Sequence, residues 1–69
     1  MEAAIFTLRA HGIIKGQVLS YGSLQKARGA CYEHSVTPMR IILGDWPKFW
    51  VVSPSDAERL VRAGYEPAF

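Results

Sequence analysis

The sequence predicts an α+β domain of two layers, in which a mainly antiparallel four-stranded sheet carries two helices on one face in the order ββαββα. Short runs of β-branched and aromatic residues are separated by turn residues, which predicts the strands. Apolar residues recur at helical spacing in two segments that each follow a serine, which predicts the helices. The 69 residues have the length of a single domain, spanning 1–69.

The first strands are predicted near the start of the chain. Residues 3–10 alternate in the direction their side chains would point and form the first strand. Residues 13–19 form the second strand, with Gly16 as a bulge. His11 and Gly12 make the turn between them, since glycine tolerates positive φ, and the pair of strands forms a hairpin.

A helix is predicted over residues 21–33, with Ser20 as its cap. Two glycines within this segment lower its helix propensity, so tertiary packing must hold it. Residues 34–38 then connect it to the next strand. The apolar face of the helix is formed by Leu24, Ala27 and Cys31.

The second half of the chain repeats the strand, turn and strand pattern. Residues 39–43 form the third strand, 44–47 have the composition of a turn, and 48–52 form the fourth strand. An offset of 33 residues relates the two halves, which indicates a possible internal duplication. The alternative is that any two ββα units look alike. The paired identities are Lys15 with Lys48, Val18 with Val51, Ser20 with Ser53, Ala30 with Ala63, Tyr32 with Tyr65, and Glu33 with Glu66.

The last helix has the most consistent local signals. Ser53 caps it, and Pro54 suits the first helical position because its missing N–H is not needed there. Asp56 lies three residues after the cap and predicts a capping-box exchange on the exposed helix end. Gly64 ends the helix, and Tyr65 makes the hydrophobic contact across that end. Its apolar stripe is Ala57, Leu60 and Val61.

With both helices on one face, the other face of the sheet is predicted to be open. The mixture of apolar, aromatic and basic residues on it is too apolar to be left in water, and such patches mark interfaces. We therefore expect this face to bind a protein partner or a second copy of the chain as a homodimer. The predicted interaction face consists of Ile5, Thr7, Arg9, Arg40, Ile42, Lys48 and Trp50.

An alternative uses the same face to bind nucleic acid. Arginines would follow the phosphates while Trp50 stacks on unpaired bases. The net charge of +2 and the pI near 9.0 favour weak contact with anionic partners, but nucleic-acid-binding domains are usually more basic.

Catalytic and metal chemistry are not expected. Cys31 and His34 are three residues apart, but a metal site needs three or four ligands and the chain has one cysteine and two histidines. Cys31 is expected to be a buried small thiol on a helix. No nucleophile motif and no phosphate-binding glycine loop is present, so we expect no enzyme activity, no cofactor and no small-molecule substrate.

The start of the chain lacks the basic residues and cleavage site of a signal peptide, and its apolar run is too short to cross a membrane. A single cysteine gives no intrachain disulfide, so nothing requires an oxidising compartment. We therefore expect a cytoplasmic protein that does not bind membranes.

The segment from Ile41 to Glu66 combines a Gly-Asp turn, the Phe-Trp-Val-Val strand, a Ser-Pro cap, an Asp-Ala-x-Arg-Leu helix and a final Ala-Gly-Tyr-Glu. It resembles a pattern in short, uncharacterised proteobacterial and phage- or prophage-encoded proteins, and covers a little over a third of the chain. The resemblance implies a bacterial or mobile-element origin and an accessory protein that binds host machinery. It implies no activity.

Overall fold

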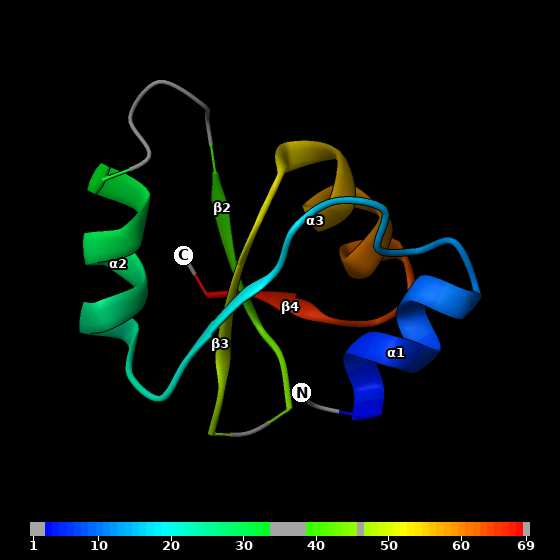
Figure 1. The fold of residues 1–69 in the computed structure, drawn as a ribbon, viewed down its shortest axis with the longest axis horizontal. Helices are drawn as coiled ribbons and strands as arrows, with labels where there is room; N and C mark the ends of the chain where they lie inside the picture. Colours follow the sequence, from blue (N-terminus) through cyan, green and yellow to red (C-terminus); the bar gives the residue numbers. More distant parts are fainter. Residues whose placement is uncertain (1–2, 34–38, 46, 69) are drawn as a thin grey trace.

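The structure, a computed structural model, describes residues 3–33, 39–45 and 47–68 (Figure 1). The predicted α+β class and the antiparallel four-stranded sheet are confirmed. The whole predicted 34–38 connection and Trp46 of the 44–47 turn lie outside the described residues. The elements in chain order are α1 (Ala3–Ala10), β1 (Leu19–Tyr21), α2 (Leu24–Glu33), β2 (Arg40–Leu43), β3 (Phe49–Val52), α3 (Pro54–Arg62) and β4 (Glu66–Pro67).

The sheet has the strand order β1-β3-β2-β4, and each neighbouring pair is antiparallel. The central β2–β3 hairpin matches the third and fourth predicted strands, and the Gly44 N–H closes it by donating to the Lys48 carbonyl at 3.0 Å. The edge strand β4 pairs with β2, with Ile42 opposite Pro67. The sequence pattern did not predict this short strand.

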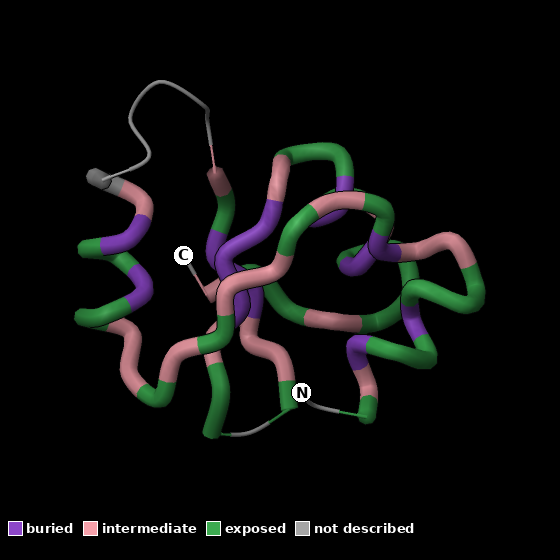
Figure 2. Tube along the Cα trace, in the orientation of Figure 1, coloured by how far each residue is buried: buried purple, intermediate pink, exposed green. Residues whose placement is uncertain are grey.

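Helices cover both faces of the sheet. Helices α1 and α3 lie on one face, and α2 lies on the other (Figure 1), so α2 adds a third layer to the predicted pair. Side chains along the central strands point alternately to the two faces of the sheet and so contribute to a hydrophobic core on each face. Trp50 and Val52 point to one face and Val51 to the other. Burial is accordingly concentrated in the central strands and the inner sides of the helices (Figure 2).

The strand predicted over residues 3–10 is wrong, because this segment is helix α1. Ile5 and Leu8 are its buried residues, and their spacing is that of one helix face. The helix ends in a Schellman motif. Gly12 has φ +74° and donates to the Arg9 carbonyl at 3.1 Å, while the Ile13 N–H donates to the Leu8 carbonyl at 2.9 Å. The predicted turn at residues 11–12 is therefore a helix end.

The strand predicted over 13–19 is also wrong in its position, since most of this segment is irregular and β1 begins at Leu19. No bulge forms at Gly16, because its N–H donates to a side chain of α3. Ser20 lies within β1, and Ser23 caps α2 by accepting from the Lys26 N–H at 3.2 Å. The structure therefore does not keep the 33-residue register, in which Ser20 corresponds to the cap Ser53.

Helix α3 has the predicted ends. The Ser53 hydroxyl accepts from the Asp56 N–H at 3.2 Å, and Pro54 occupies the start of the helix. Gly64 has φ +105°, and the Tyr65 N–H donates to the Leu60 carbonyl at 3.0 Å, which completes a second Schellman motif.

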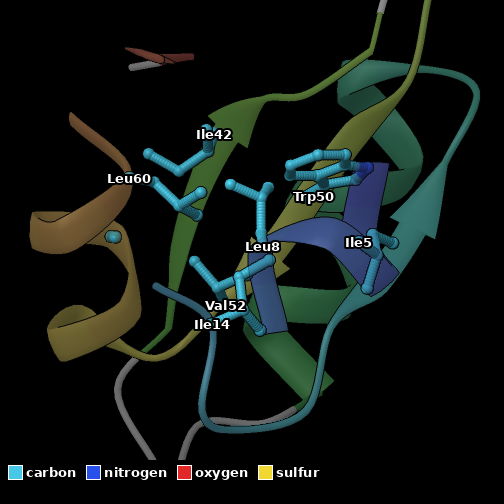
Figure 3. Packing of buried hydrophobic residues seen from close by; sticks show 8 residues of the cluster. Ile5, Leu8, Ile14, Ile42, Trp50, Val52 and Leu60 are labelled. Carbon is cyan, nitrogen blue, oxygen red and sulfur yellow. The ribbon is translucent and has the colours of Figure 1, made fainter. Parts of the chain in front are cut away.

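Trp50 is the centre of the core between the sheet, α1 and α3 (Figure 3). Its side chain is 0% exposed, and its ring lies 5.5 Å from the ring of Tyr65 at an angle of 38°. Gly44 packs directly on the indole, because a Cβ at this position would overlap the ring. The hairpin turn therefore needs a residue without a side chain at this point.

We predict that Gly44→Ala lowers the free energy of unfolding by about 1–3 kcal/mol, since the added methyl group forces Trp50 or the hairpin to move. Urea denaturation measures this change. The control is Gly29→Ala, because a Cβ there meets nothing within 4 Å and alanine favours a helix, so stability should rise by up to about 1 kcal/mol. Equal effects of the two substitutions would contradict the prediction.

Candidate functional site

The predicted interaction face is covered in the structure. Ile5, Ile42 and Trp50 are buried, with exposed fractions of 4%, 1% and 0%. The face was expected to be open, and this expectation is wrong because α1 and α3 pack on it (Figure 3). Thr7 and Arg9 share helix α1 with Ile5 and are exposed, and so are Arg40 and Lys48.

Asp56 lies in the first turn of α3, three residues after the cap, as predicted. Its side chain was expected to be exposed there, and this expectation is wrong because it is 1% exposed. Its carboxylate accepts from the Lys15 N–H at 3.1 Å and the Gly16 N–H at 2.9 Å, and it also pairs with the Arg59 guanidinium. The Arg59 Nε donates to the Ile13 carbonyl at 2.9 Å. We call this arrangement the Asp56–Arg59 latch, because it fastens residues 13–16 to α3.

The electrostatics of the latch favour an ionised carboxylate. Burial alone raises the pKa of Asp56, but the hydrogen bonds from Lys15 and Gly16 and the charge of Arg59 outweigh it, so the pKa lies below its usual value. A carboxylate held by these donors is poorly suited to accept a proton from a substrate. The latch is therefore a structural arrangement.

A surface groove of about 420 Å³ lies between α3 and the strands β2 and β4. Helix α3 contributes residues at positions i, i+3, i+4 and i+7, which form one helix face. The rim of the groove includes Val61, a large hydrophobic residue that is 45% exposed. We call this the α3–β2 groove, and it is lined by Arg40, Ile41, Ile42, Pro54, Ala57, Glu58, Val61 and Pro67.

Two of the predicted interaction residues, Arg40 and Ile42, line this groove. Ile42 belongs to its buried apolar floor, and Arg40 is exposed. On the α3 side, the Glu58 carboxylate accepts from the Arg62 guanidinium at 2.6 Å, and the two residues are spaced i,i+4 on the exposed side of the helix. The sequence signal for the groove was weak, because its lining comes from three elements that alternation and helical spacing do not bring together.

The described residues offer little support for a reactive cysteine, a metal site or a membrane span. The Cys31 thiol is half-buried, and burial raises its pKa despite the nearby charge of Arg40, so it is a poor nucleophile at neutral pH. Within residues 3–33, 39–45 and 47–68, histidine, cysteine and acidic side chains form no group of three that could hold a metal. None of the helices in this same part of the chain has the length and apolarity needed to cross a membrane.

No family model, curated protein or solved structure matches this chain. The resemblance of the segment from Ile41 to Glu66 to short phage and bacterial proteins therefore stays a prediction. The groove and the latch are interpreted from their own geometry.

We predict that Asp56→Asn lowers the free energy of unfolding at pH 7 by about 2–4 kcal/mol, because the amide leaves Arg59 without its buried counter-ion and disturbs two backbone donors. Chemical denaturation measures the loss. Glu58→Gln is the matched control, since its pair with Arg62 is exposed and should change stability by less than about 0.5 kcal/mol. A loss as small as that of the control would mean that the latch does not hold the loop.

The latch also predicts how stability depends on pH. Because the folded pKa of Asp56 is lowered, its contribution is complete above the unfolded pKa of about 4 and is lost as pH falls through the folded pKa. The stability difference between wild type and Asp56→Asn should stay constant from pH 7 to about pH 5 and shrink below about pH 4. Denaturation curves at several pH values measure it, and a difference that grows in acid would contradict the prediction.

Proposed function

We propose that this chain is a small, non-catalytic protein-interaction module, and that the α3–β2 groove is where a segment of a partner protein binds. The observation that carries the proposal is an accessible groove with an apolar floor and the exposed Val61 on its rim. Its volume of about 420 Å³ lies within the range of pockets that receive ligand groups.

The wall of the groove formed by α3 is held in place before any partner binds. The helix is capped by Ser53, ends at Gly64, and is joined to the rest of the chain by the latch. Such preorganisation lowers the ordering cost of binding, so a small contact area can give useful affinity.

The resemblance of the second half of the chain supports a role as a bacterial or phage accessory protein that binds a host protein. Self-association is the other use of the groove. Sedimentation or light scattering over a micromolar concentration range distinguishes them, because a groove filled by a second copy gives a mass that rises with concentration. A monomer leaves the groove free for another protein.

The nucleic-acid alternative loses its main support in the structure. Trp50, which was expected to stack on bases, is 0% exposed. Arg9 and Arg40 are exposed on different elements, and no described geometry joins them into one basic surface. We therefore favour a protein partner.

Val61→Lys should weaken peptide binding to the groove. We propose to select a displayed library of random dodecapeptides on the immobilised protein and to measure the affinity of the enriched peptides by fluorescence polarisation. The substitution should weaken them by at least about tenfold, because the lysine ammonium group would have to lose its hydration against an apolar peptide side chain.

The matched control is Phe6→Lys, because Phe6 on α1 is the other large exposed hydrophobic residue in the described part of the chain, at 59%, and does not line the groove. Its affinities should equal those of wild type. Peptides that depend on Phe6 and tolerate Val61→Lys, or a selection that enriches none, would contradict the proposal.

A further inference from the structure

Arg40 gives the α3–β2 groove a positive charge at one of its ends. It is the first residue of β2 and pairs with Val52, the last residue of β3 before the cap of α3. Its side chain is exposed and lines the groove. Among the side chains that the structure describes, those of residues 3–31, 39–45 and 47–68, no carboxylate pairs with it.

The acidic residue of the groove has its own partner. The Glu58 carboxylate is bound by Arg62, and both side chains are largely exposed, with fractions of 65% and 74%. Its charge is therefore balanced within the protein, whereas no side chain that the structure describes carries a carboxylate paired with Arg40. The groove combines an apolar floor with a net positive end, and the charge complementary to it is a carboxylate.

We propose that the groove selects a segment of a partner protein in which an aspartate or glutamate lies next to an aliphatic side chain, and that Arg40 binds that carboxylate. This inference rests on the proposed function and names the chemistry of the partner. The aliphatic group packs on the exposed apolar side chains of the lining, Pro54, Val61 and Pro67, while the guanidinium offers the planar pair of donors that matches a carboxylate.

A basic segment is disfavoured at this site, because its charge would face Arg40 as the floor of the groove excludes water. A nucleic-acid phosphate could also pair with Arg40. The groove lining contains no aromatic residue on which a base could stack, so the described lining favours a protein segment.

The test uses the same dodecapeptide selection on wild type and on Arg40→Glu. Wild type should enrich peptides with an acidic residue beside Leu, Ile or Val, whereas Arg40→Glu should enrich Lys or Arg at that position. For each enriched wild-type peptide, replacing its Asp by Asn or its Glu by Gln should weaken binding about tenfold. Arg40→Gln should weaken binding by the same factor. Combining Arg40→Gln with the neutralised peptide should weaken binding little more than either change alone.

Two controls separate charge from folding. Arg40→Lys keeps the charge but not the paired donors, and it should retain part of the affinity. Glu58→Gln removes the opposing carboxylate and should leave affinity equal or a few-fold higher. Thermal melting of each variant should match wild type, because the side chains of Arg40 and Glu58 are exposed.

The outcomes distinguish this inference from the proposed function. Peptides that bind in the groove and need Val61, but show no acidic preference or no dependence on Arg40, overturn the inference alone. A selection that enriches no peptide, or only peptides insensitive to Val61→Lys, overturns both. Displacement of the acidic peptides by a twelve-residue oligothymidine at equal concentration would assign Arg40 to phosphate and also overturn the inference.

Discussion

The buried carboxylate of Asp56 is the contact on which the arrangement of the other elements depends. It receives two backbone N–H groups from a loop about forty residues away in the chain, and Arg59 holds the Ile13 carbonyl of the same loop. Ile13 also closes the end of α1 through its bond to the Leu8 carbonyl. An unbroken series of hydrogen bonds therefore joins α1 to α3. Because these two helices cover Trp50 together, the latch determines that this face of the sheet is closed.

Helix α3 contributes residues both to the hydrophobic core and to the surface groove. Ala57 and Leu60 are buried on its inner side, while Glu58 and Val61 stand on the outer side beside the groove. The latch acts on the same helix, and a displacement of α3 would alter the core, the loop and the groove together. We expect this coupling to hold the shape of the groove in so small a domain, where few other contacts are available to hold a surface helix.

The sequence predicted α3 and the β2–β3 hairpin well, because caps, glycine ends and strand composition are local signals. It failed for α1, although the spacing of Leu8, Gly12 and Ile13 is the same as that of Leu60, Gly64 and Tyr65 at the end of α3. The alternating pattern of residues 3–10 predicts a strand, but Ile5 and Leu8, the buried residues three positions apart, have the spacing of a helix face. The latch could not be foreseen, because its donors are backbone groups distant in sequence.

The candidate site shows what alternation can and cannot predict. The register places Arg40, Ile42 and Trp50 on one face of the sheet, as the sequence pattern indicated. Alternation gives the direction of a side chain but not what covers it. Helices α1 and α3 bury the centre of that face, whereas Arg40 at the start of β2 stays exposed. The α3–β2 groove is therefore the uncovered margin of the predicted face. The exposed charge of Arg40, and not the buried ring of Trp50, determines which partner this margin can bind.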